Sequence, residues 1–102
     1  DIKTVKALID NGFEVRAYDP SQTEQFAQYF NIGLQHSAEA ALNSADAAVI
    51  ATEWSEFKLM PAELFAFKLK RKVLFDLRGV FSPEALKAVG VKYRGIGRKI
   101  DA

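Results

Sequence analysis

Two patterns of apolar residues alternate along this chain of 102 residues. Residues 1–10 place apolar side chains at helical spacing, whereas residues 13–18 alternate apolar with polar side chains, which is the period of a strand. The same succession continues to residue 94, and it predicts parallel strands joined by right-handed helical crossovers. We therefore expect an α/β fold with a Rossmann-like, doubly wound and mainly parallel sheet.

Capping and turn residues set the expected limits of these elements. Ser37 and Ser82 are suited to helix N-caps, and glycine follows two of the helical segments, at Gly12 and Gly90. The continuous apolar run Ala47–Ala51 is typical of a central strand covered on both faces. Strands are predicted at 13–18, 34–36, 47–51, 73–77 and 91–94, and helices at 1–10, 21–30, 37–43, 61–67 and 82–89.

Composition limits the classes of function. The 14 basic and 13 acidic residues nearly balance, so no net field would gather a nucleic acid. With no cysteine and only His36, no thiolate nucleophile is present and no metal site is expected. No apolar run approaches the ~20 residues of a membrane span. We expect one domain over residues 1–102, no nucleic-acid or membrane partner, and a cytoplasmic location.

Ligands of such sheets bind beyond the carboxyl ends of the strands, so the residues after each strand are the candidates. Asp19 stands where a ribose-binding acid would stand, but no glycine-rich turn precedes it, and helix capping is the stronger interpretation. Gly95-Ile96-Gly97 lacks the third glycine of a dinucleotide fingerprint. No nucleophile elbow is present either, so we assign no catalytic residue.

Arg78 is the strongest candidate for ligand binding. It follows the buried strand at 73–77, and Gly79 leaves room beside it, so its guanidinium could bind a phosphate through two parallel hydrogen bonds. An ion pair with Asp76 or a glutamate is the alternative, and the pattern alone leaves both open. Trp54 and Phe57 are more typical of packing than of base stacking.

Four segments together carry a family resemblance. They are Glu14–Pro20, Ala48–Phe57, Phe75–Gly79 and Tyr93–Arg98. Over nearly the whole chain they resemble the C-terminal UDP-binding domain of UDP-glucose 6-dehydrogenases. The resemblance implies an NAD-dependent parent enzyme that oxidises UDP-glucose to UDP-glucuronate. The catalytic cysteine of that family lies in regions with no match here, so this chain alone is expected to be inactive and not to bind NAD.

The resemblance also assigns roles to the Arg78 loop. Arg78 matches the family arginine that contacts the nucleotide sugar, and Asp76 is expected to orient the loop. The family usually has asparagine after that arginine, whereas this chain has Gly79. The expected substrate-binding residues are therefore Arg78, Asp76 and Gly79.

The family domain begins with a strand and a binding loop that precede the first residue here, so the sheet is expected to lack its first strand. That strand would lie between the strands near Val15 and Val49, and its absence would leave unpaired edges that favour self-association. We expect a homo-oligomer, through the parent or these edges. The rival hypothesis is a non-catalytic α/β regulatory or assembly domain that keeps the fold without the ligand.

Overall fold

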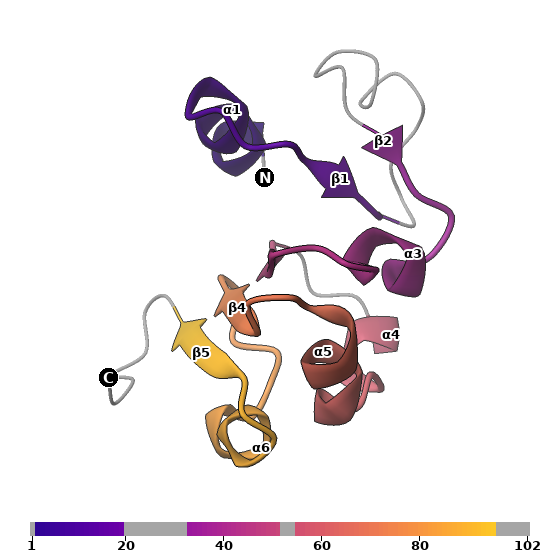
Figure 1. Ribbon diagram of the computed structural model, residues 1–102, viewed down its shortest axis with the longest axis vertical. Helices are drawn as coiled ribbons and strands as arrows, with labels where there is room; N and C mark the ends of the chain where they lie inside the picture. The colour runs from indigo at the N-terminus through magenta and orange to yellow at the C-terminus, as the bar shows by residue number, and fades with distance from the viewer. Residues whose placement is uncertain (1, 20–32, 52–54, 96–102) are drawn as a thin grey trace. The chain divides into compact units, whose positions relative to one another are not determined.

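The computed structural model describes residues 2–19, 33–51 and 55–95 (Figure 1). The chain forms two compact units, Asp1–Ala41 and Leu42–Ala102, and each is described by itself. None of the described helices is long and apolar enough to cross a membrane. In chain order the elements are α1 Ile2–Asp10, β1 Arg16–Ala17, β2 Gly33–Leu34, α3 Ala38–Leu42, β3 Ala47–Ile50, α4 Ser55–Lys58, α5 Ala62–Lys68, β4 Val73–Asp76, α6 Pro83–Ala88 and β5 Lys92–Gly95.

Helix α1 ends in the glycine cap that the sequence predicts. Gly12 has a left-handed φ of +84°, and the backbone N–H groups of Phe13 and Gly12 donate to the carbonyl oxygens of Leu8 and Ile9, at 3.0 Å each. This is the Schellman arrangement, which satisfies carbonyls that the helix end would otherwise leave without donors. The chain then turns toward β1.

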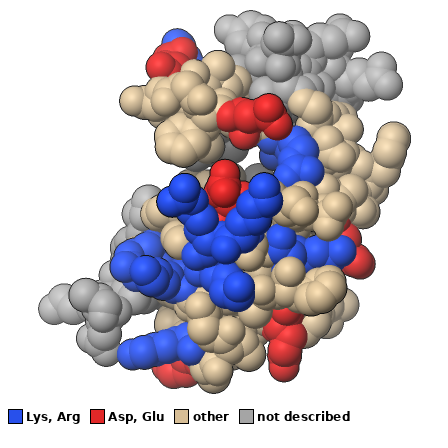
Figure 2. Space-filling view, viewed as in Figure 1, with Lys and Arg blue, Asp and Glu red and all other residues tan. Residues whose placement is uncertain are grey.

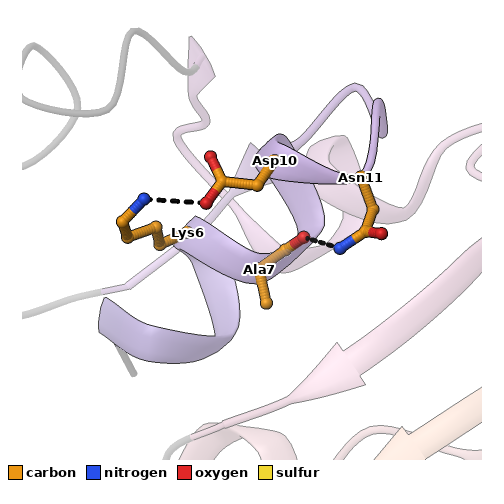
Figure 3. Close-up of polar contacts among 4 residues, drawn as sticks. All are labelled: Lys6, Ala7, Asp10 and Asn11. Atoms are coloured by element: carbon orange, nitrogen blue, oxygen red, sulfur yellow. Dashed lines mark hydrogen bonds and ion pairs between the residues drawn. The ribbon is translucent and has the colours of Figure 1, made fainter.

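Two side-chain contacts lie along the last turns of α1 (Figure 3). Lys6 Nζ pairs with Asp10 Oδ2 at 2.7 Å, and Asn11 Nδ2 donates to the Ala7 carbonyl oxygen at 2.7 Å. The ion pair is exposed on both sides, and exposed pairs of this spacing contribute only about 0.5 kcal/mol. The contact is a surface feature of α1 with little weight in the fold.

Strands β1 and β2 pair in parallel, with Arg16 opposite Gly33 and Ala17 opposite Leu34. One further hydrogen bond, from the Gln35 N–H to the Ala17 carbonyl oxygen at 2.7 Å, extends the ladder. Both strands are shorter than the sequence predicts. The helix expected at 21–30 lies outside the described residues.

The second unit contains a parallel sheet in the order β3-β4-β5. Both crossovers step in the same direction across the sheet, and right-handed connections therefore place α5 and α6 on the same face (Figure 1). The core lies between that face and the helices. Its fully buried apolar members are Phe65, Leu74, Leu86 and Val91, and the rings of Phe65 and Phe81 meet edge to face at 5.1 Å.

Alternate side chains of this sheet have different environments. Ala48, Ile50 and Leu74 are buried, whereas Val49 is 36% and Phe75 41% exposed. Within this unit α5 and α6 lie on one face of the sheet, so the coverage of the run 47–51 on its other face stays a prediction. A continuous apolar run does not reveal on which face a helix packs.

Helix α6 has both of the caps expected from its sequence. The Ser82 Oγ accepts a hydrogen bond from the Ala85 N–H at 3.2 Å, and Gly90 has a φ of +84°. The Val91 N–H donates to the Leu86 carbonyl oxygen at 3.0 Å, a second Schellman arrangement that leads directly into β5.

The α/β class with parallel strands is confirmed. The expected strands at 47–51, 73–77 and 91–94 lie within one residue of β3, β4 and β5 at each end. The described strands form two sheets, β1-β2 and β3-β4-β5. The single domain and the upstream strand between β1 and β3 stay predictions.

Candidate functional site

Three parallel strands end at the same level of the β3-β4-β5 sheet. Ile50, Asp76 and Gly95 lie opposite one another in register, and the Leu77 N–H adds one more ladder bond, to the Ile50 carbonyl oxygen at 2.9 Å. At this edge the structure describes the loop 77–82, which joins the central strand β4 to α6. This loop carries the residues that the sequence singled out.

The buried carboxylate of Asp76 accepts hydrogen bonds from backbone N–H groups of this loop. Asp76 is the last residue of β4 and has no exposed surface. Its Oδ2 accepts hydrogen bonds from the Phe81 N–H at 2.9 Å and from the Tyr93 hydroxyl at 2.7 Å, and its Oδ1 accepts one from the Arg78 N–H at 3.2 Å. One carboxylate therefore ties both ends of the loop to the sheet.

These donors keep the buried carboxyl ionised. Burial acts to raise the pKa of Asp76, but hydrogen bonds from the Phe81 backbone, the Tyr93 hydroxyl and the Val80 and Arg78 backbones outweigh it. The pKa of Asp76 is consequently lowered from its ordinary value of 3.8. At neutral pH the loop is built around a desolvated negative charge. The inward direction of this carboxylate favours the expected orienting role over direct contact with a ligand.

Arg78 lies two residues beyond the carboxyl end of β4, the central strand of this sheet. The predicted location of Arg78 at the carboxyl end of a central strand is thus confirmed, while the position of its guanidinium near the mouth of a cleft stays a prediction. Its side chain is exposed, and its hydrogen bond to Asp76 uses the backbone N–H. Contact of its guanidinium with a ligand stays a prediction.

Gly79 adopts a left-handed backbone, with a φ of +68°. Glycine adopts this conformation without strain, and asparagine tolerates it better than most other residues. The family resemblance implies asparagine at this position, and the left-handed φ accounts for an exchange between these two residue types. The geometry gives Gly79 a part in the turn, while its expected part in binding stays a prediction.

Tyr93 belongs to the same network, although sequence reasoning did not select it. It lies in β5 opposite Leu74, is 5% exposed, and points its hydroxyl at the end of the neighbouring strand. A signal was available, because the strand period of residues 91–94 puts Tyr93 on the buried face and a buried tyrosine hydroxyl requires a partner. Asp76 was the acidic residue of the adjacent strand.

The remaining candidates have mixed outcomes. Phe57 is buried, which confirms packing for this member of the predicted pair; Trp54 lies outside the described residues, as do Thr52, Glu53 and Ile96–Arg98. Asp19 is half-buried after β1, and the helix it was expected to cap is also undescribed. Within the part of the chain that the structure describes, no group of three or more potential ligand residues could hold a metal ion.

Basic side chains gather at the opposite edge of the sheet. Lys70, Arg71 and Lys72 precede β4 and are exposed, and Figure 2 shows Lys and Arg side chains clustered over this part of the surface. Arg71 Nε lies 3.6 Å from Asp46 Oδ1 in an exposed pair. This cluster lies at the amino ends of the strands, so it is separate from the Asp76 network.

Known proteins share the sequence pattern of this chain over most of its length. A family model described as the UDP binding domain of the UDP-glucose/GDP-mannose dehydrogenase family matches residues 1–83, which include Asp76, Arg78 and Gly79. Among curated proteins, the chain is 32% identical to a UDP-glucose 6-dehydrogenase of Rickettsia bellii over 102 residues, covering 97% of this chain and 24% of that protein.

Similar enzymes come from distant organisms. A UDP-glucose 6-dehydrogenase of Pseudomonas aeruginosa is 31% identical over 92% of this chain and 22% of its own length. One of Haloferax volcanii is 38% identical over 78% of this chain and 18% of its own length. The chain spans about a quarter or less of the length of these relatives.

Proposed function

This chain belongs to the UDP-glucose/GDP-mannose dehydrogenase family, whose UDP binding domain it matches, and we propose that it binds the diphosphate of UDP-glucose within a longer enzyme. That enzyme would be an NAD-dependent UDP-glucose 6-dehydrogenase, oxidising the sugar's 6-hydroxyl to the carboxylate of UDP-glucuronate. The proposal includes a cytoplasmic location and self-association of the enzyme.

The position of Arg78 carries the proposal. An arginine at the carboxyl edge of a parallel sheet stands where ligands of such folds bind, and a guanidinium matches the geometry of a phosphate with two parallel N–H donors. The loop around it is held by the ionised Asp76, so the Arg78 backbone is fixed before a ligand arrives. A fixed loop reduces the entropy lost on binding.

The chain's own part in the reaction is binding and orientation. Its 102 residues contain no cysteine and no glycine-rich strand-to-helix turn, so they do not fit the family's nucleophile or an NAD pyrophosphate. NAD, which accepts the hydride from the sugar, would be bound by the rest of the longer protein. Arg78 would hold the diphosphate and thereby set where the sugar lies.

Calorimetric titration of the full-length protein with UDP tests the proposal. Arg78→Lys should weaken UDP binding by about tenfold or more, because a lysine keeps the charge but loses the bidentate fork, and a hydrogen bond to a charged group contributes roughly 1.5–3 kcal/mol. The matched control is Arg71→Lys, the same change at the exposed opposite edge of the sheet, and it should leave UDP affinity unchanged.

Two outcomes contradict the proposal. A folded wild-type protein that binds neither UDP nor UDP-glucose would favour the non-catalytic regulatory or assembly domain. Equal UDP affinities of Arg78→Lys and wild type would remove Arg78 from the binding site and leave it a structural residue of the loop.

A further inference from the structure

The hydroxyl of Tyr93 is a buried polar group in an otherwise apolar setting. Tyr93 is 5% exposed, and its neighbours on this face of the sheet, Leu74 and Ala48, are buried and apolar. A phenylalanine would fill nearly the same space without burying a hydroxyl. The hydroxyl therefore has its physical justification in the 2.7 Å hydrogen bond to Asp76 Oδ2.

That bond acts on the carboxylate that holds the Arg78 loop. The oxygen that accepts from Tyr93 also accepts from the Phe81 N–H at 2.9 Å, and the second oxygen of Asp76 accepts from the Arg78 N–H at 3.2 Å. A carboxylate can rotate about the bond that joins it to its β-carbon. Because Tyr93 comes from a different strand, its bond restrains this rotation independently of the loop.

We propose that Tyr93 is a positioning residue of the nucleotide site, which fixes the direction of the Asp76 carboxylate and thereby the backbone from which Arg78 reaches the diphosphate. The inference rests on the proposed function, since it assigns a role toward the same ligand. It extends the site from β4 to β5, and to a residue beyond the 1–83 segment that the family model matches.

A purely structural role is the alternative. In that case Tyr93 stabilises the sheet, and its loss lowers stability without a specific effect on UDP. The two roles differ in coupling: a residue that acts through Arg78 has no effect on UDP affinity once Arg78 is gone, whereas an independent residue has the same effect in both backgrounds.

The test is a double-mutant cycle on the full-length protein, with UDP affinity measured by calorimetry for wild type, Tyr93→Phe, Arg78→Ala and the double variant. Tyr93→Phe should weaken UDP binding on the order of three- to tenfold in the wild-type background and less than about twofold in the Arg78→Ala background. Hydrogen exchange followed by mass spectrometry should show faster exchange in residues 77–81 of Tyr93→Phe.

Leu86→Val is the control for lost stability. Leu86 is fully buried in α6 and takes no part in the hydrogen bonds of Asp76, so this variant should lower stability and leave UDP affinity and the exchange of residues 77–81 unchanged.

The outcomes separate the inference from the proposed function. Unchanged UDP affinity in Arg78→Ala contradicts the proposed function, and the inference with it. The inference alone is contradicted if Arg78→Ala weakens UDP binding but Tyr93→Phe does not. It is also contradicted if Tyr93→Phe weakens UDP binding equally in the wild-type and Arg78→Ala backgrounds.

Discussion

Removing the Asp76 carboxylate should be among the most destabilising single changes at the carboxyl edge of the β3-β4-β5 sheet. Asp76→Ala leaves the Tyr93 hydroxyl and the Phe81 N–H buried without their acceptor, and each such group costs about 1–3 kcal/mol. The Arg78 N–H is only partly buried, so water can replace its acceptor at little cost. The expected loss is therefore roughly 2–6 kcal/mol, a large share of the ~5–15 kcal/mol that stabilises a typical domain.

Native-state hydrogen exchange of the full-length protein measures this loss locally, since it reports the opening free energy of each segment. Asp76→Ala should raise exchange in residues 77–81 by at least about thirtyfold, the rate equivalent of ~2 kcal/mol. The matched control is Asp46→Ala: Asp46 makes an exposed ion pair at the other edge of the sheet, which is worth about 0–1 kcal/mol. Equal effects of the two substitutions would refute the role assigned to the Asp76 carboxylate.

Two further predictions concern pH and the cap of α6. The folded-state pKa of Asp76 is lowered from 3.8, so its ionised form contributes stability that is present above that value and lost as pH falls through the lower folded pKa. Urea titrations of wild type and Asp76→Asn measure this contribution as the difference between their free energies of unfolding. That difference should be constant at about pH 5–8 and shrink below about pH 4. A constant difference down to pH 2 would contradict this assignment. Gly90→Ala should lower the free energy of unfolding by about 1–2 kcal/mol, because a Cβ there meets nothing within 4 Å and only the φ of +84° opposes it. Gly90→Asn should lower it less, since asparagine tolerates this φ better. Equal melting temperatures for wild type and both variants would contradict the reasoning.

Local chemistry made much of the fold predictable. Ser37 and Ser82 cap helices because a serine hydroxyl satisfies a helix N–H, and Gly12 and Gly90 end helices because they adopt a left-handed φ without strain. These effects depend on a few neighbouring residues. The coverage of β3 depends instead on the direction of two crossovers, so the exposure of Val49 and Phe75 was not foreseeable from the run of apolar residues.

The residues of the candidate site also differ in how far the sequence could predict them. Arg78 and Gly79 could be located from the strand before them, because both follow β4 directly in the sequence. Tyr93 is 17 residues from Asp76, and their contact depends on the register between β4 and β5. A one-residue change of register would turn the tyrosine to the other face of the sheet. Sequence patterns indicate the period of a strand, but they leave its register open.

The two arginines that flank β4 have different supports at their backbones. Arg71 precedes Lys72, which has a left-handed φ of +52°. The Arg71 side chain forms an exposed ion pair with Asp46, with Nε 3.6 Å from Oδ1. Arg78 is held through its backbone N–H by a carboxylate that has no exposed surface and whose other donors come from the far end of the loop and from β5. Moving the Arg78 backbone would therefore leave a buried charge short of donors, whereas moving the Arg71 backbone breaks a single backbone hydrogen bond, from its N–H to the Asp46 carbonyl oxygen at 3.0 Å, and an exposed ion pair. This energetic difference supports Arg78, rather than Arg71, as the arginine that would orient the proposed diphosphate.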